Sequence, residues 1–397
     1  MPERAVPSRG DPAATARRAN ASAGECGAKD QVSCSGSPTV PYGVAVVGPT
    51  GTGKTALAVA IARHLGRAEL VSVDAMAVYR GLDVGTAKPT ESERRGLRWH
   101  LVDIAEPDEE FSVAEFQTAG RAALAAIRAR RNVPILVGGT GLYHRALLDD
   151  LELPGRFPEV ARALEREAEA AGVANLYERL VALDPTAASR IEPGNRRRVL
   201  RALEVSVGSG RRFSDYGPGI DAYPPSVWIQ IGLALPRARL DERIAGRLAW
   251  QLDHGFVDEA RALARRPGSL SRTAAQALGY RELLAWLSGE TSYDFAVAEA
   301  LRRTRAFARR QERWFRRDPR ITWLDAEDDG LLGDAVGLVE SGGLESGELE
   351  SGELESGELE SGELESDGSA SPGRSVAPGC VPSGRPDGGR TGRSRET

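Results

Sequence analysis

The chain has 397 residues, of which 41% are hydrophobic and 27% charged, and its formal net charge is −5. No apolar run approaches the roughly 18 residues that a membrane helix needs, so we expect no membrane-spanning helix and no membrane partner. The three cysteines, Cys26, Cys34 and Cys380, lie near the chain ends, which excludes a disulfide framework in the central region. The N-terminus lacks the apolar centre of a secretory signal, and we therefore expect a cytoplasmic protein.

The two ends of the chain differ in composition from its centre. Residues 1–41 are rich in Ala, Ser, Gly, Pro and Arg, and residues 327–397 contain the five-residue repeat LESGE before a Gly- and Arg-rich end. Such segments bury too little apolar surface to offset the entropy of ordering, so both are predicted to be disordered. The remaining 42–326 is long enough for one large domain or two smaller ones.

Strands and helices alternate through the first part of the foldable region. The apolar runs and their boundaries predict strands at 43–47, 69–74, 100–104 and from 133 into a glycine turn, with helices over 54–64 and from the capping-box sequence SVAE at 112 to about 131. Alternation of this kind predicts a doubly wound parallel sheet with ligands at the carboxyl ends of its strands.

The pattern then becomes purely helical over 149–223 before a strand returns at 227–235. Helices follow to about residue 317, and a short strand is predicted at 321–324. We therefore predict an α/β core of the P-loop NTPase type, formed by 42–148 and 224–326 and interrupted by a helical insertion at 149–223.

The charge is unevenly distributed. Residues 190–320 contain 25 Arg and 15 acidic residues, a local excess of +10, whereas the segment after Asp325 is acidic. A basic region attracts polyanions such as nucleic acid, although ordinary solvated helix faces would give a similar count.

The sequence GPTGTGKT matches the phosphate-binding loop G-x-x-x-x-G-K-[ST] and stands between a strand and a helix. It comprises Gly48, Pro49, Thr50, Gly51, Thr52, Gly53, Lys54 and Thr55. Backbone N–H groups of such a loop surround a phosphate, the lysine reaches the terminal phosphates, and the final hydroxyl binds Mg²⁺. The whole chain has three lysines, and one of them is in this loop.

The loop does not identify its ligand. The strand at 133–137 ends in Gly138-Gly139-Thr140 where an ATPase usually has a carboxylate. The nearest carboxylate at a strand end is Asp74, which by position alone is a metal ligand, a general base or a helix N-cap.

Five segments in order complete the motif pattern: GPTGTGKT, VSVDAMAVYRGLDVGTAKP, VPILVGGTGLY, RRRVLRALEV and AQALGYREL. Together they resemble the tRNA dimethylallyltransferases, also called tRNA isopentenyltransferases or the IPP transferase family, over about residues 44–324. The resemblance implies that the loop binds dimethylallyl diphosphate, with Mg²⁺ as cofactor, instead of ATP. It also implies transfer of the prenyl group to N6 of the adenosine 3′ of the anticodon of tRNA by a monomeric enzyme.

The resemblance assigns roles to individual residues. Asp74 would be the general base for the adenine amino group, Thr50 and Arg247 would act at the reacting centre, and Arg243 would join the loop and Lys54 in binding diphosphate. The alternative for Arg243 and Arg247 is a solvated stripe of one helix. Positions implied to contact tRNA are Asp74, Ala75, Met76, Ala77, Thr140, Arg162, Arg197, Arg198, Arg201, Gln276, Gly279 and Tyr280.

Two departures and two alternatives accompany these assignments. Many family members have Ser where this chain has Ala75, and an Arg where it has Ala161, with Arg162 adjacent. Thr140 is also compatible with a plain strand-to-helix turn. Aromatic residues in RRTRAFARRQERWFRR suit RNA stacking, but their helical spacing favours a core position for Phe307, Trp314 and Phe315.

Other functions remain compatible with the phosphate loop. An adenylate isopentenyltransferase would prenylate free nucleotides, and a small-molecule kinase would consume ATP. A P-loop RNA-binding protein without catalysis would bind tRNA but form no product. The basic region and the full helical insertion favour a macromolecular acceptor.

Overall fold

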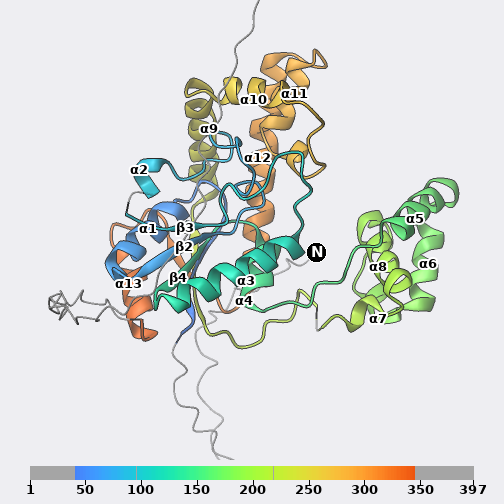
Figure 1. Ribbon diagram of the computed structural model, residues 1–397, viewed down its shortest axis with the longest axis horizontal. Helices are drawn as coiled ribbons and strands as arrows, with labels where there is room; N and C mark the ends of the chain where they lie inside the picture. The colour runs from blue at the N-terminus through green and yellow to red at the C-terminus, as the bar shows by residue number, and fades with distance from the viewer. Residues whose placement is uncertain (1–40, 95, 218, 345–397) are drawn as a thin grey trace, which may run out of the picture. The chain divides into compact units, whose positions relative to one another are not determined.

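The computed structural model describes residues 41–94, 96–217 and 219–344 (Figure 1). The predicted disorder of 1–40 and of the repeat at 345–397 concerns residues outside these ranges. Within them, no helix has the length and apolar character needed to cross a bilayer.

The centre of the fold is a six-stranded sheet in the order β3-β2-β4-β1-β5-β6, and every neighbouring pair is parallel. This confirms the predicted parallel sheet. Its strands are β1 (Gly43–Val47), β2 (Ala68–Ser72), β3 (Trp99–His100), β4 (Val133–Val137), β5 (Trp228–Ala234) and β6 (Thr322–Asp325). Strand β1 is central and fully buried, because its side chains alternate between two apolar layers.

Helices cover both faces of the sheet (Figure 1). Val44 and Val46 of β1 pack with α1 (Lys54–Leu65) and α13 (Leu331–Ser341), whereas Ala45 faces the layer that contains α3 (Val113–Ala129) and α4 (Gly141–Leu148). Helix α3 begins at the predicted capping box, in which the Ser112 side chain accepts from Glu115 N and the Glu115 side chain accepts from Ser112 N.

The predicted strand at 100–104 is wrong beyond His100. Leu101 and Asp103 have φ values of 61° and 58°, a left-handed conformation that an extended strand cannot contain. The buried Lys88 ammonium holds this bend, since it donates to Asp103 Oδ1 at 2.6 Å and to Asp83 Oδ1 at 2.6 Å. The short helix α2 (Glu91–Arg94) precedes the bend.

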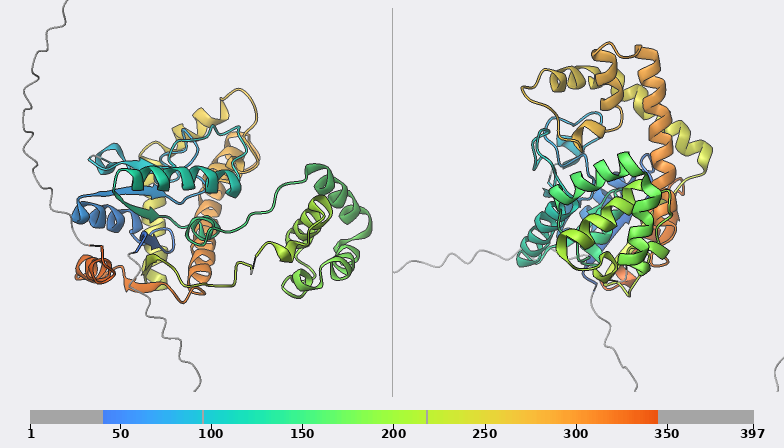
Figure 2. Two further views of the ribbon diagram at one scale, coloured as in Figure 1. Left: turned by 60° about the horizontal axis from the view of Figure 1, so that its bottom comes forward. Right: turned by 90° about the vertical axis from the view of Figure 1, so that its right-hand side faces the viewer.

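The helical insertion is a cluster of four helices with its own apolar core (Figure 2). These helices are α5 (Pro158–Ala171), α6 (Val173–Leu183), α7 (Pro185–Ser189) and α8 (Arg196–Ser209), followed by the 3₁₀ turn η1 (Phe213–Asp215). Leu164, Leu176, Leu180 and Leu203 are almost fully buried at its centre. This arrangement agrees with the purely helical sequence pattern at 149–223.

A second helical region follows β5. It consists of α9 (Arg237–Asp253), α10 (Phe256–Ala264), the 3₁₀ turn η2 (Ala274–Gln276), α11 (Tyr280–Leu287) and the long α12 (Tyr293–Phe315). Helix α12 packs against α11, α9 and α4, so its last turns approach the phosphate loop.

The prediction that disorder begins at residue 327 is wrong, because α13 is a helix packed on α1. Ala335 and Val339 are fully buried, and Glu340 pairs with His64 of α1 at 2.9 Å. The segment LLGDAVGLVE has apolar residues four apart, a helical signal that lies directly before the repeat.

Candidate active site

The phosphate loop is built as its sequence requires. Gly48, Gly51 and Gly53 have φ values of 137°, 92° and 94°, which glycine adopts without strain. A Cβ at Gly48 would lie 2.7 Å from the Leu233 carbonyl oxygen of β5, so only glycine fits between the loop and that strand. The loop then enters α1 at Lys54, which directs the positive end of this helix toward the loop.

Lys54 is held across the loop, with its Nζ donating to the Pro49 carbonyl oxygen at 2.7 Å. Loss of hydration and the nearby Arg247 guanidinium together lower the pKa of Lys54 to about 7, against the opposing effect of the Asp74 carboxylate. These three charged groups therefore lie within electrostatic reach of one another at the carboxyl edge of the sheet.

Arg247 reaches the loop from α9. Its Nη2 donates to Thr50 Oγ1 at 2.8 Å, which brings together two residues 197 positions apart. Burial lowers the pKa of Arg247, and the Asp74 carboxylate raises it. Helix α9 lies close because Ile244 and Leu240 pack over Gly51, where a Cβ would lie 3.3 Å from Ile244.

Asp74 follows β2 and faces these cations. Its Oδ1 accepts from Met76 N at 2.8 Å and from Ala77 N at 3.3 Å, so the side chain caps a turn and not the start of a helix that one of the alternatives predicted. Among the described residues no group bonds to Oδ2. One carboxylate oxygen thus fixes the orientation of Asp74 and leaves the other available for chemistry.

Thr140 lies beside this carboxylate. Its Oγ1 accepts from Ala75 N at 3.2 Å, which ties the turn after β4 to the turn after β2. The turn approaches closely because Gly138 has no side chain: a Cβ there would lie 2.1 Å from the Val73 carbonyl oxygen. Thr140 is therefore part of the site as well as the start of α4.

Gln311 of α12 is a site residue that the sequence analysis missed. Its Oε1 accepts from Thr50 N at 2.8 Å, and its Nε2 donates to the Gly139 carbonyl oxygen at 2.9 Å. The side chain is buried. A lone glutamine within an arginine-rich helix gives no motif signal, and only its buried position reveals its role.

Thr55 is suited to a magnesium ion bound together with phosphate. In the part of the chain that the structure describes, its hydroxyl has no hydrogen-bond partner, and no group of three or more His, Cys, Asp or Glu side chains is placed to hold a metal. Mg²⁺ commonly keeps several waters and is bound through one or two protein ligands plus phosphate oxygens. The residues present fit a cation of that kind and not a metal caged by protein.

Several residues implied at the site are placed elsewhere. Arg243 is half-exposed and pairs with Glu327 at 3.4 Å, so its assignment to the diphosphate stays a prediction. Tyr280 is fully buried and donates its hydroxyl to Glu259, and Gly279 is buried with φ 84° against Phe256. The side chain of Ala77 is also buried.

Tyr280 supports a loop through Glu259 of α10. Glu259 accepts from the backbone N–H groups of Asp83, Val84 and Gly85 at 2.8, 2.9 and 3.1 Å, and Tyr280 bonds the same carboxylate. The segment GLDVGTAK is thereby fixed, and the sequence analysis did not identify Glu259. Of the AQALGY segment, Gln276 is the exposed member.

The arginines of the insertion fall into two groups. Arg197 and Arg198 at the start of α8 are exposed, and their guanidinium groups have no partner among the described residues. Arg162 is exposed and pairs with Glu159. Arg201 instead donates to the carbonyl oxygens of Pro154 and Gly155 at 2.9 and 3.1 Å. Arg201 therefore links α8 to the segment at Pro154 and Gly155 that leads into the insertion.

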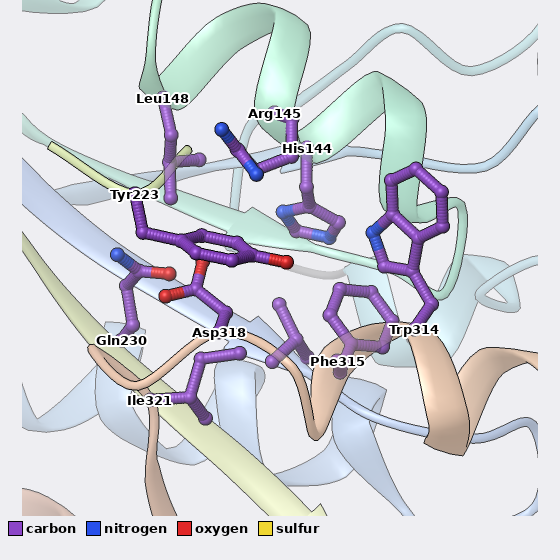
Figure 3. A pocket seen from close by; sticks show the side chains of 10 residues that line it. His144, Arg145, Leu148, Tyr223, Gln230, Trp314, Phe315, Asp318 and Ile321 are labelled. Atoms are coloured by element: carbon purple, nitrogen blue, oxygen red, sulfur yellow. The ribbon is translucent and has the colours of Figure 1, made fainter. Parts of the chain in front are cut away.

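The core position predicted for three aromatic residues of α12 is confirmed for Phe315, whereas Trp314 is partly buried against the same cluster and Phe307 is partly buried outside any core cluster. Phe315 is buried, and Figure 3 shows it beside His144, Trp314 and Tyr223 in a small pocket between α4 and α12. His144 Nε2 lies 3.2 Å from the Gly138 carbonyl oxygen, and burial lowers its pKa to about 3. The imidazole is therefore neutral and adds no charge behind the site.

Comparison with known proteins identifies the family of this chain. The sequence model of the IPP transferase family matches residues 77–318, and that of the ATPase family associated with various cellular activities matches 44–96, around the phosphate loop. Proteins named tRNA dimethylallyltransferase from Salinispora tropica and a Nocardioides species are 50% and 46% identical to this chain. Each alignment covers 75% of this chain, and they cover 92% and 95% of those proteins.

Two solved structures extend the comparison. The tRNA isopentenylpyrophosphate transferase of Bacillus halodurans is 36% identical, with a TM-score of 0.56 over 75% of this chain and 95% of that one. A eukaryotic dimethylallyltransferase acting on tRNA is 25% identical, with a TM-score of 0.59 over 72% and 74%. Together with the site geometry, these matches show that the chain belongs to the IPP transferase family.

Proposed function

We propose that this protein transfers the dimethylallyl group of dimethylallyl diphosphate to N6 of the adenosine 3′ of the anticodon in tRNA. The observation that carries the proposal is the convergence of Asp74 with Lys54, Arg247 and Thr50 at the carboxyl edge of the sheet. A transfer of this kind needs a base for the acceptor and positive charge for the departing diphosphate. A carboxylate next to a cationic phosphate-binding loop supplies both. We further propose that it acts as a cytoplasmic monomer.

On the donor side, the allylic C–O bond breaks and its electron pair stays with the diphosphate. In this proposal Lys54, Arg247 and the loop N–H groups other than that of Thr50 stabilise that charge as it develops. Mg²⁺ bound through Thr55 would supply further positive charge to the diphosphate oxygens. The same loop binds ATP in many other proteins, but here the triphosphate-consuming reaction of a kinase has no support from the family match.

On the acceptor side, adenine N6 forms the new bond to the allylic carbon and loses a proton. Asp74 Oδ2 is the acceptor for this proton, because Oδ1 is committed to the amides of Met76 and Ala77. Thr140 lies next to that carboxylate and is available to the same adenosine. The adenosine must leave its stack to reach these groups, and unstacking costs least in a single-stranded loop.

The test is to incubate the purified protein with unmodified tRNA, Mg²⁺ and dimethylallyl diphosphate, digest the RNA and measure N6-isopentenyladenosine by mass spectrometry. Two variants separate the roles of Asp74. Asp74→Asn keeps an oxygen that can cap the turn but cannot accept the proton, whereas Asp74→Ala removes both functions.

We expect product with the wild-type protein and at least a hundredfold lower kcat with both variants, within the range that general bases contribute. Loss with Asp74→Ala but full activity with Asp74→Asn would reduce Asp74 to a cap. Prenylated AMP with no product on tRNA would point to the nucleotide transferase, and ATP-dependent phosphorylation would point to a kinase. Tight tRNA binding without any product would identify a non-catalytic RNA-binding protein.

A further inference from the structure

We propose that Gln311 is a positioning residue that fixes the distance between the donor-binding and the acceptor-binding halves of the site. The inference rests on the proposed transferase function and adds to it a residue on α12, more than 250 positions after the phosphate loop. Gln311 bonds the phosphate loop with one amide atom and the Gly139 turn with the other.

The two bonds restrict the choice of side chain. Thr50 N can only donate and the Gly139 carbonyl can only accept, so the bridging group must present one acceptor and one donor about 2 Å apart. A primary amide does this, and the 2.8 and 2.9 Å bonds fix which end is oxygen. Leucine or methionine can fill the space but leaves both backbone groups unpaired.

The position of Gln311 is itself determined by packing. Its side chain is buried, and Phe315, one turn further along α12, is buried beside His144 of α4. Gly139 is required for the contact, because a Cβ there would lie 2.1 Å from Gln311 Nε2. The bridge is therefore held by the core and is not a mobile surface contact.

Each end of the bridge leads to a group that acts on a different substrate. At the loop end, the anchored Thr50 presents Oγ1 to Arg247, which the proposed function assigns to the diphosphate. At the other end, the Gly139 turn continues into Thr140, which bonds Ala75 N next to Asp74. A shift of one half relative to the other would leave both substrates bound, but with the allylic carbon and N6 at the wrong separation.

The decisive variant is Gln311→Glu. At neutral pH a carboxylate would place negative charge against the Gly139 carbonyl oxygen, whereas the protonated acid has an O–H that can donate to it. Burial raises the pKa of such a carboxyl, so protonation occurs within an accessible pH range. Activity relative to wild type should therefore rise as the pH falls.

The control is Gln117→Glu. Gln117 is a buried glutamine on α3 whose Nε2 donates to the carbonyl oxygens of Ala146 and Leu151 at 2.7 and 2.9 Å, and it bonds no residue of the candidate site. The Gln117→Glu variant makes the same replacement of a buried amide by a carboxyl group, with a similar loss of protein stability, away from the candidate site. Gln311→Met, which keeps the shape without the amide, supplies a variant with no titratable group.

The experiment measures kcat and both KM values from pH 5.5 to 8 with dimethylallyl diphosphate and tRNA, together with thermal unfolding. For Gln311→Glu we expect kcat at least tenfold below wild type at pH 8, at least threefold relative recovery at pH 5.5, and KM changes below threefold. Gln311→Met should lose kcat without recovery, and Gln117→Glu should keep wild-type kcat throughout.

An unchanged kcat for folded Gln311→Met, or a pH response shared by Gln117→Glu, would overturn the inference while leaving the transferase function intact. Absence of product with wild-type protein would instead count against the proposed function. If neither Gln311 variant folds, Gly139→Ala is measured instead, because its methyl group displaces the Gln311 amide. A kcat equal to that of the wild type would contradict the proposal. A kcat at least tenfold lower would support it.

Discussion

At the scale of single residues, Lys54 is the group whose charge the site controls most directly. Its pKa falls to about 7 because the loop strips its ammonium of water and Arg247 is near. A bound diphosphate would add negative charge and raise that pKa again. Donor binding therefore takes up a proton whenever Lys54 is partly neutral in the free protein.

This linkage predicts how the affinity for diphosphate depends on pH. Below pH 7 Lys54 is already protonated and the affinity is at its maximum; as the pH rises above 7, binding must first protonate Lys54 and weakens by up to about tenfold per pH unit. Lys54→Arg stays charged and should lack this slope. Calorimetric titration with diphosphate between pH 6.5 and 9 gives the affinity of both proteins. The ionisation of the ligand is the same in both titrations, so it cancels in the comparison. Parallel pH profiles of affinity would contradict the prediction.

Some residues of the candidate site could be predicted from the sequence, and others could not. The phosphate loop could be predicted from its local spacing between a strand and a helix, whereas the roles of Asp74 and Thr140 were implied by the family resemblance. Arg247 was identified by the family resemblance and lies where it implies. Gln311 and the buried state of Tyr280 could not be predicted, since both depend on contacts between α12, α10 and loops far away in the chain.

At the scale of elements, α13 completes the apolar layer on one face of the sheet. It packs on α1 and on the strands β5 and β6, and its buried side chains Ala335 and Val339 lie four residues apart. The sequence pattern that predicted disorder was dominated by the repeat that follows, and the short apolar helix before it was overlooked. Boundaries between folded and repetitive sequence are poorly marked when the last helix is short.

Val339→Ala should therefore lower the free energy of unfolding by about 2 kcal/mol, because it removes two fully buried methyl groups and leaves a cavity. Leu332→Ala on the same helix is the control, since Leu332 is 46% exposed and should change stability by less than about 0.5 kcal/mol. Urea denaturation of the two variants gives the comparison. Equal, negligible effects would mean that α13 is not packed in solution.

At the scale of the whole molecule, the arginine excess of 190–320 is partly used inside the protein. Arg201 and Arg320 bond backbone carbonyls or buried carboxylates, whereas Arg197 and Arg198 point outward from α8. A count of charges cannot separate these groups, because Arg197, Arg198 and Arg201 belong to one helix and differ in the face of α8 that they occupy.

Arg198→Ala should weaken tRNA binding uniformly and reduce the slope of log K against log salt by about one unit, as expected when one phosphate contact is lost. Arg201→Ala should leave that slope unchanged and lower the unfolding temperature, because its hydrogen bonds to Pro154 and Gly155 are lost. Filter binding at several salt concentrations, paired with thermal unfolding, distinguishes the two. A reduced slope for Arg201→Ala would reverse their assignments.

The strand order also has a consequence for synthesis of the protein. The central strand β1 is made early, but β5, which pairs with one of its edges, begins about 180 residues later at Trp228, after the whole insertion. At about 5–20 residues per second, a ribosome takes on the order of 10–40 s to supply that partner. Both edges of β1 are open until β4 is made, and one edge then stays open until β5 appears, so the length of the insertion sets most of this second part of the interval.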